Sequence, residues 1–381
     1  MSERNLLMIP GPVEFEPSVL RALGEKTRSH LDPVFMKAYG RVLKRLREVF
    51  IAPTAQPFVV AGSGTLAMEM AVANLIQPGD KALVVNSGYF SDRIGIMLER
   101  HGATVTHLRA DAGALPPADE VEVALSTGGF KLMTITHVDT STAVLAPVKE
   151  LAAAAKKHGV LVVVDGVCSV GGEALEMDAW GVDVTFTASQ KALGTPPGLA
   201  VLLAGPRAMA AWKARTRPVA SMYLDFAEWL PIHEAYEAEK PSYFATPPVN
   251  LIMALDVSLG HLVDEGMSSR VERHVELATS MWAAWEALGL SSLPKSHAVS
   301  AHTLSAVYYP RGVDVALVKA VAAEGVVIAG GLHPQLKPKY FRVGHMGAVT
   351  RSDLVTTVSA IERGLKACGH PVELGRGVAA L

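Results

Sequence analysis

Lys191 is a lysine in a constrained and largely apolar setting. It stands in the segment 189–194 (Ser-Gln-Lys-Ala-Leu-Gly), between the apolar run 182–187 and the rigid turn 196–198 (Pro-Pro-Gly). Such surroundings lower the pKa of an amine and favour its attack on a carbonyl carbon to form a Schiff base. The sequence therefore indicates a nucleophilic lysine, with an ordinary surface lysine as the alternative.

The turn 61–65 (Ala-Gly-Ser-Gly-Thr) could bind an anion. It follows an apolar run and opens a helical pattern, so unpaired backbone N–H groups and the positive end of a helix dipole would meet there. Gly64 lets the backbone approach a phosphate, and Ser63 or Thr65 adds a hydroxyl; a plain helix-capping turn is the alternative. The segment matches neither the GxGxxG fingerprint nor the Walker A loop, which argues against NAD and ATP.

Two charged residues adjoin apolar runs. Asp165 follows the run 160–164, at the strand end where open α/β sheets place their ligand crevice. A protonated ring nitrogen could supply the counter-charge that a semi-buried carboxylate needs; an ordinary turn with Gly166 is the alternative. Arg342 lies inside the short apolar run 340–343, where it could bind the α-carboxylate of an amino or keto acid, or form an internal salt bridge.

Two further positions could contact a flat ligand. The polar segment 136–142 follows another apolar run, and its hydroxyl groups and His137 could reach a ring substituent. A polar loop that satisfies its own backbone is equally compatible. Phe90 follows the tip 86–88 and could stack on a planar cofactor or pack in the core, and spacing alone leaves both choices open.

An alternation of apolar runs and helical segments must position these residues. The runs are rich in β-branched residues and almost continuously apolar, as strands covered by helices on both faces require. They cover residues 58–61, 82–86, 131–136, 160–164, 182–187 and 199–203, and the crossover helices between them cover 65–76, 90–101 and 147–158. The pattern predicts an α/β fold with a mainly parallel sheet.

The rest of the chain departs from this alternation. A Pro- and aromatic-rich stretch covers 217–248, a helical pattern covers 250–263, and a break follows at 265–267. A long helix with mixed charges begins at residue 268, and strand-like runs cover 300–309, 326–329 and 340–343. We therefore predict an N-terminal arm (1–20), a large domain (21–265) and a smaller C-terminal α+β domain (266–381).

Composition argues against several classes of function. The chain has 381 residues, 50% of them hydrophobic, and a formal net charge of −2, which gives no basic footprint for nucleic acid or an anionic membrane. No run approaches the roughly 18 to 20 apolar residues of a membrane span, and we expect no signal peptide. Cys168 and Cys368 cannot form a disulfide framework or a metal knuckle. We expect a cytoplasmic protein without a metal that acts on small molecules.

Together these segments resemble the class V aminotransferases, which are pyridoxal-phosphate (PLP) enzymes of fold type I, and most closely the alanine–glyoxylate and serine–pyruvate aminotransferases. The resemblance covers nearly the whole chain, from 10–12 (Pro-Gly-Pro) through 30–33, 63–65 and 165–172 to 342–344. Its most specific part is 189–193, followed by 196–198. It implies a large PLP-binding domain with a seven-stranded-type sheet and a smaller C-terminal domain. By this match Lys191 forms a Schiff base with PLP and Asp165 pairs with the pyridine nitrogen, so both are catalytic.

The resemblance also assigns the remaining site residues. Contacts to the phosphate, the ring and its oxygen would come from Ser63, Gly64, Thr65, Phe90, Thr140, Gln190, Tyr243 and Thr246. Arg342 would bind the substrate carboxylate. Tyr243 and Thr246 match the segment with which a neighbouring subunit reaches the phosphate, which implies a homodimer with shared active sites. Mammalian members have Trp where Phe90 stands and His where Thr65 stands, so these two contacts differ here.

The implied reaction is transamination between a small amino acid, alanine or serine, and a 2-oxo acid, glyoxylate or pyruvate. Lys191 would exchange for the substrate amine and then act as general base. The alternative is (S)-ureidoglycine–glyoxylate transamination in purine catabolism. A cysteine desulfurase would need a Cys in the loop 344–348, which has none. The turn 61–65 argues against a dinucleotide-binding protein, because it lacks that class's glycine pattern. The presence of Lys191, Asp165 and Arg342 together argues against a non-catalytic scaffold.

Overall fold

The computed structural model describes residues 5–381, and its centre is a seven-stranded sheet with the order β2-β10-β9-β8-β5-β3-β4. The strands are β2 (Gln56–Ala61), β3 (Lys81–Asn86), β4 (Thr104–Arg109), β5 (Leu132–Thr136), β8 (Leu161–Asp165), β9 (Val184–Ala188) and β10 (Leu199–Ala204). β10 is antiparallel to both of its neighbours, and the other adjacent pairs are parallel. The prediction of a mainly parallel sheet is confirmed.

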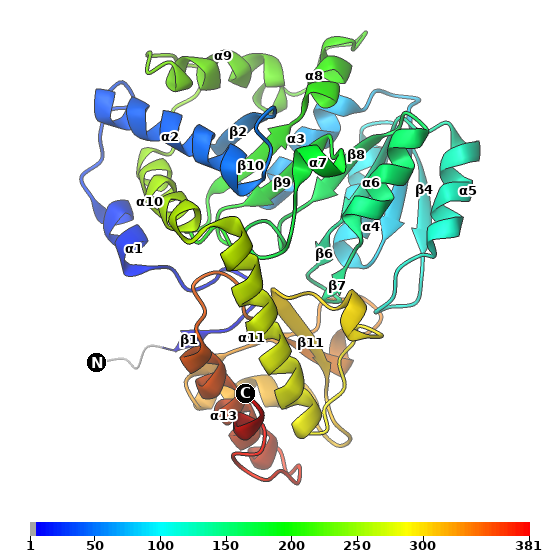
Figure 1. Ribbon diagram of the computed structural model, residues 1–381, viewed down its shortest axis with the longest axis vertical. Helices are drawn as coiled ribbons and strands as arrows, with labels where there is room; N and C mark the ends of the chain where they lie inside the picture. The colour runs from blue at the N-terminus through cyan, green and yellow to red at the C-terminus, as the bar shows by residue number, and fades with distance from the viewer. Residues whose placement is uncertain (1–4) are drawn as a thin grey trace.

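Helices cover both faces of this sheet (Figure 1). Strand β8 shows why its sequence is apolar throughout. Val162 and Val164 pack into one hydrophobic cluster with α2 (Pro33–Val49), α6 (Val148–Lys157) and α10 (Val249–Glu265). Val163 points to the other face and packs into a second cluster, with α3 (Gly64–Leu75) and α4 (Tyr89–Arg100). Alternate residues of one strand therefore fill two cores, as a doubly covered sheet requires.

The predicted crossover helices α3, α4 and α6 are present, but the sequence analysis missed several other elements, among them strand β4 and helix α5 of the region around the sheet. Strand β4 lies at the sheet edge, and none of its residues is buried. Helix α5 (Ala118–Gly128) buries only Val121 and Leu125. Both elements lack the continuous apolar pattern that revealed the others, because each has a large solvent-facing side.

The C-terminal part is built around a different core. Helices α10 and α11 (Met267–Ala287) separate at Gly266, whose φ of 78° ends the first helix. Beyond α11, an antiparallel sheet and helix α13 (Arg351–Ala367) pack around Trp285 and Phe341. The strands of this sheet, in spatial order, are β11 (Leu304–Tyr308), β14 (Tyr340–Gly344) and β13 (Ala329–Gly330). Figure 1 shows α11 running from the large sheet toward these elements.

The start of the described chain lies against this C-terminal part, because strand β1 (Leu6–Leu7) pairs with β12 (Val326–Val327). The division into arm, large domain and small domain stays a prediction. The remaining elements are α1 (Pro17–Gly24), β6 (Val138–Asp139), β7 (Val144–Leu145), α7 (Met177–Trp180), α8 (Pro206–Lys213), α9 (Phe226–Glu237) and α12 (Ala316–Ala323). Across residues 5–381, no helix combines the length and apolar character needed to cross a membrane.

Candidate active site

The carboxyl ends of the parallel strands meet at a cavity of about 190 Å³. Turns or helix starts that follow β2, β3, β5, β8 and β9 all contribute to its wall. Eight of the residues singled out in the sequence line it: Ser63, Gly64, Thr65, Phe90, Thr140, Asp165, Gln190 and Lys191. Met68, Arg93, Val138 and Val167 complete the lining. The sheet thus brings together residues that lie up to 128 positions apart, counted from Ser63 to Lys191.

Lys191 is half-buried and closely covered by the segment 10–12 (Pro-Gly-Pro). Its Nζ donates a hydrogen bond to the carbonyl oxygen of Pro10. Gly11 has a φ of +112°, and a Cβ there would lie 2.5 Å from Nζ. A glycine is therefore required at position 11, both for its backbone conformation and to leave space for the amine.

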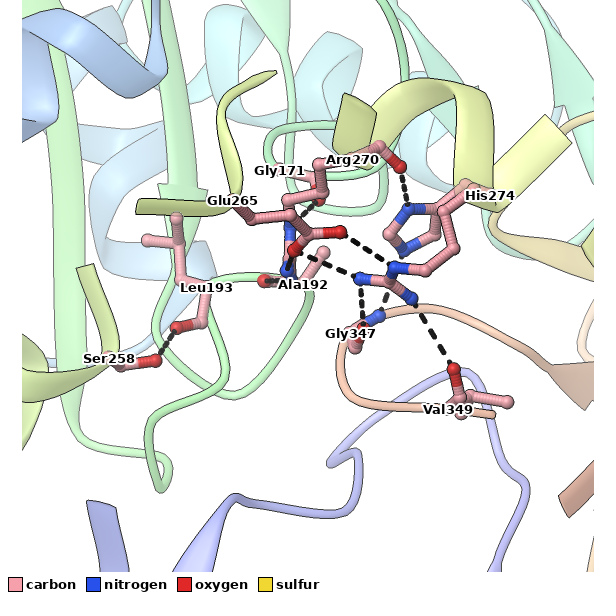
Figure 2. Close-up of polar contacts among 10 residues, drawn as sticks. Gly171, Ala192, Leu193, Ser258, Glu265, Arg270, His274, Gly347 and Val349 are labelled. Carbon is pink, nitrogen blue, oxygen red and sulfur yellow. Dashed lines mark hydrogen bonds and ion pairs between the residues drawn. The ribbon is translucent and has the colours of Figure 1, made fainter. Parts of the chain in front are cut away.

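The loop that carries Lys191 is fastened from behind by the start of α11. Arg270 is buried and donates from Nε to the carbonyl of Gly171 (2.7 Å) and from Nη2 to that of Ala192 (2.9 Å), and its Nη1 pairs with Glu265 at 2.6 Å. Ser258 donates to the carbonyl of Leu193 at 2.6 Å. Figure 2 shows these contacts converging behind residues 192 and 193.

The same contacts continue into the C-terminal part. Arg273 pairs with Glu265 at 2.7 Å and donates to the carbonyls of Gly347 (3.1 Å) and Val349 (3.3 Å). We call Ser258, Glu265, Arg270 and Arg273 the rear network. Through it, Arg270 and Arg273, about one turn apart on α11, hold the lysine loop and the loop after β14.

Asp165 is a buried carboxylate on the cavity wall. It is 3% exposed and accepts a hydrogen bond from the N–H of Val167 at 3.0 Å. Burial raises its pKa to about 7, with a smaller contribution from the nearby Asp139 carboxylate. A cationic ligand atom placed beside it would stabilise its ionised form.

Phe90 lies at the start of α4 and is positioned by Asp139. The buried Asp139 carboxylate accepts hydrogen bonds from the N–H groups of Phe90 (3.0 Å) and Ser91 (3.4 Å), and also from the N–H of Ser141 at 2.9 Å. It thereby ties the helix that carries Phe90 to the loop that carries Thr140. The sequence analysis singled out the segment 136–142 but did not assign Asp139, because the helix start whose N–H groups it accepts from lies 48 and 49 positions away in the chain.

Arg93 is a second cavity residue that the sequence analysis missed. Its guanidinium lies 5.0 Å from the ring centroid of Tyr89 and 5.1 Å from that of Phe90. Nη1 donates to Thr65 Oγ1 at 3.2 Å, and Nη2 to the Tyr89 hydroxyl at 2.9 Å. Its spacing of three and four residues from two aromatics on one helix could have revealed it.

Arg342 lies next to the Thr140 loop. It donates from Nη1 to the carbonyl of Thr140 (3.1 Å) and from Nε to that of Gly330 (2.9 Å). Among residues 5–381 it has no ion-pair partner, so the internal salt bridge left open by the sequence is not formed. Burial lowers the pKa of this guanidinium. Its charge is available to an anion from outside the chain.

Arg342 is not among the residues that line the cavity, and neither are four others that the sequence analysis discussed. Tyr243 is 62% exposed and lies 3.4 Å from Thr246, from hydroxyl to hydroxyl, on the surface. His137 was considered a possible ring contact, but it is buried beside Trp180 and lines a different cavity. Burial lowers its pKa to about 3, so it is a neutral packing residue. Cys168 is buried with its Sγ 2.7 Å from Thr140 Oγ1, in agreement with a packing role.

Comparison with known proteins identifies the family. The pattern of the family described as aminotransferase class-V matches residues 18–357. The chain belongs to the class V aminotransferases. It is 41% identical over 356 residues to alanine–glyoxylate aminotransferase 1 of Saccharomyces cerevisiae, covering 90% of this chain and 91% of that protein.

Two solved structures resemble this class V aminotransferase along nearly its whole length. The alanine–glyoxylate aminotransferase of a Nostoc species is 33% identical, with a TM-score of 0.89 and 96% of each chain covered. The ureidoglycine–glyoxylate aminotransferase of Bacillus subtilis is 25% identical, with a TM-score of 0.92 and coverage of 100% of this chain and 97% of that one. The expected family and fold are therefore confirmed.

Class V aminotransferases use PLP, and the cavity of this aminotransferase fits that cofactor. Gln190 has a buried side-chain oxygen without a hydrogen-bond partner in residues 5–381. Ser63 is the N-cap of α3 but makes no side-chain cap bond, which leaves its hydroxyl and the helix start for an anion. Asp165 needs a cation and Lys191 is an amine. The start of α3 suits the phosphate of PLP, Asp165 suits its ring nitrogen, and Lys191 suits its aldehyde.

Proposed function

We propose that this aminotransferase uses PLP to move an amino group between a small amino acid, alanine or serine, and a small 2-oxo acid, glyoxylate or pyruvate. The observation that carries the reaction type is one cavity in which Lys191, Asp165 and the start of α3 meet. The acceptor is supported by the comparisons, since all three relatives described above have glyoxylate in their names.

When bound, PLP supplies a ring that accepts the electron pair left on the substrate as its Cα proton departs. In this proposal Lys191 holds the cofactor until the substrate amine replaces it. The N–H groups at the start of α3 and the hydroxyls of Ser63 and Thr65 bind the phosphate, together with the Gln190 amide. Phe90 packs on the ring face, at the position that Asp139 fixes.

The proton steps fall to Lys191 and Asp165. Once released, the Nζ of Lys191 removes the Cα proton of the substrate, and it returns a proton in the reverse half-reaction. The Pro10 carbonyl and the rear network keep the amine within the cavity. Asp165 keeps a proton on the ring nitrogen, because a buried carboxylate with a raised pKa is strongly stabilised by an adjacent cation.

Arg342 binds the substrate carboxylate in this proposal. Two backbone carbonyls hold its Nε and Nη1, and Nη2 has no partner in residues 5–381. A carboxylate can therefore pair with the free edge of the guanidinium without displacing a protein carboxylate. Thr140 is the side chain near the ring oxygen, and its own carbonyl orients Arg342.

Initial rates with a panel of amino donors test the substrate assignment. Alanine, serine and ureidoglycine are each paired with glyoxylate, and serine and ureidoglycine also with pyruvate, on PLP-loaded protein and on the Lys191→Ala variant as blank. We expect alanine or serine with glyoxylate to give the largest kcat/KM. Turnover with none but ureidoglycine would contradict this assignment and support the alternative donor, which the close structural match to the Bacillus subtilis enzyme favours.

We also propose a homodimer in which Tyr243 and Thr246 of one copy reach the phosphate site of the other. The exposure of Tyr243 and its absence from the cavity of its own chain support this arrangement. Mixing Lys191→Ala chains with Thr246→Ala chains tests it, because a mixed dimer would contain one site with both native residues. Recovery of tight PLP binding is expected, and its absence would contradict shared sites.

The two unpaired cysteines support a reducing, cytoplasmic location.

A further inference from the structure

Arg93 is the charged residue of the cavity for which the proposed reaction gives no role. Of the residues in 5–381 that line the cavity, Lys191 and Arg93 are the two with cationic side chains. Lys191 is engaged in holding the cofactor aldehyde. Arg93 is then the cation left to balance the charge of a bound phosphate.

The structure holds this guanidinium at the anion-binding end of the cavity. Its Nη1 lies 3.2 Å from Oγ1 of Thr65, which stands in the first turn of α3. The Tyr89 hydroxyl and the two aromatic rings fix the rest of the group. No carboxylate in residues 5–381 forms an ion pair with it, and its two hydrogen bonds go to neutral hydroxyls. The nearest charge of opposite sign on the cavity wall is that of Asp165, which interacts with it without a direct contact.

A phosphate ester carries a charge of about −1.5 to −2 near neutral pH, whereas a helix start supplies roughly +0.5. The hydroxyls of Ser63 and Thr65 add hydrogen bonds but no charge. We propose that Arg93 is the counter-ion of the cofactor phosphate, so that it makes the site selective for phosphorylated over unphosphorylated pyridoxal. This inference rests on the proposed use of PLP.

Binding of PLP and of pyridoxal to the cofactor-free protein tests the proposal without measuring turnover. Titrations followed by absorbance and tryptophan fluorescence give both dissociation constants for the wild type, Arg93→Gln and Arg93→Lys. The matched control is Arg100→Gln, an exposed arginine two turns further along α4. For Arg93→Gln we expect the Kd of PLP to rise about 10- to 100-fold, while that of pyridoxal changes less than about twofold. Arg93→Lys should recover part of the loss.

The result that overturns the inference is an equal weakening of PLP and pyridoxal, or no weakening of either. Equal weakening would mean that Arg93 acts by packing on Tyr89 and Phe90. If Arg93→Gln does not fold, Arg93→Met repeats the test, because it keeps an unbranched stem against both rings while removing the charge. A wild-type protein that binds no PLP would instead refute the proposed function, which keeps the two failures distinct.

Discussion

The two sides of the Lys191 loop differ in how fully their buried polar groups are hydrogen-bonded or ion-paired within the protein. On the cavity side, some buried polar groups are only partly paired by the protein: Asp165 accepts one backbone hydrogen bond but has no ion pair, and the Gln190 oxygen has no hydrogen bond in residues 5–381. On the rear side, Arg270 uses all three of its nitrogens on Gly171, Ala192 and Glu265. One side is incomplete without a ligand, and the other is complete without one.

This difference separates function from stability within a few ångströms of one lysine. Buried polar groups without partners cost free energy, so native proteins retain few of them and place them where a ligand completes the set. Buried groups with all partners make the backbone rigid and hold a site in its working geometry. Substitutions on the cavity side should change ligand binding and catalysis, and those on the rear side should change the free energy of unfolding.

The largest effect is expected from Lys191→Ala. In the proposed reaction, loss of the amine removes the attachment point of the cofactor and the base for the Cα proton, so kcat should fall by on the order of 10⁴-fold or more. The fold should persist, because the contacts of Ala192 and Leu193 with the rear network use backbone carbonyls. Single-turnover rates and thermal unfolding measure both quantities. Lys213→Ala, an exposed lysine at the end of α8, should leave both unchanged.

Asp165→Asn should lower kcat by about 10²- to 10³-fold and at the same time stabilise the cofactor-free protein at pH 8. Burial raises the pKa of Asp165 from 3.8 to about 7, so the folded state keeps a proton that the unfolded chain releases. Its contribution to stability is therefore present near pH 4, decreases as the pH rises toward 7, and is lost above that. Since asparagine cannot ionise, the variant should gain on the order of 2 kcal/mol at pH 8.

Chemical denaturation of the cofactor-free proteins at several pH values measures this gain. The difference between Asp165→Asn and wild type should shrink toward zero as the pH falls to about 4. Asp264→Asn serves as the control, since Asp264 is exposed. A variant that is less stable than wild type at pH 8 would show that the protein already stabilises the ionised Asp165 carboxylate. That result would contradict the view that the cavity side is incomplete without a ligand.

Arg270→Gln tests the rear side. It leaves the buried carbonyls of Gly171 and Ala192 without their donor and removes the buried arginine of an ion pair with the half-buried Glu265, so the free energy of unfolding should fall by about 2 to 4 kcal/mol. Arg270→Lys should recover part of it, and the exposed Arg311→Gln should have no effect. The Kd of PLP should rise much less than in Arg93→Gln. A large loss of PLP affinity with unchanged stability would contradict the assignment of Arg270 to the rear network.

The two sides also differ in how far the sequence predicted them. The cavity residues follow strand ends, so the pattern of apolar runs by itself places Ser63, Asp165 and Lys191 at one edge of the sheet. Eight predicted residues do line one cavity. Arg93 escaped notice because its significance depends on which face of α4 turns toward the cavity, and Asp139 because its partners are backbone N–H groups 49 and 48 positions away.

The rear network could not be predicted from the sequence. Arg270 and Arg273 stand in a helix with mixed charges, where a solvated face is the ordinary interpretation. Their partners at positions 171, 192, 347 and 349 become neighbours only through the tertiary fold. The same holds for β4 and α5, whose exposed sides leave no continuous apolar signal. The spacing of apolar residues predicts which face of a segment is buried. The contacts of the rear network depend instead on which residues of other segments the fold places beside that face.

The smallest expected effects come from a pair of serines that differ mainly in the side they occupy. Ser258 is buried and donates to the Leu193 carbonyl, so Ser258→Ala should lower the free energy of unfolding by about 1 kcal/mol and leave the Kd of PLP unchanged. Ser63 is exposed and makes no cap bond, so Ser63→Ala should leave stability unchanged and weaken PLP about 5- to 10-fold. Denaturant titration and PLP titration of both variants give the four values. If both variants lost stability alike, Ser63 would be a structural cap; if both lost affinity alike, the lysine loop would transmit changes at its rear side to the cavity.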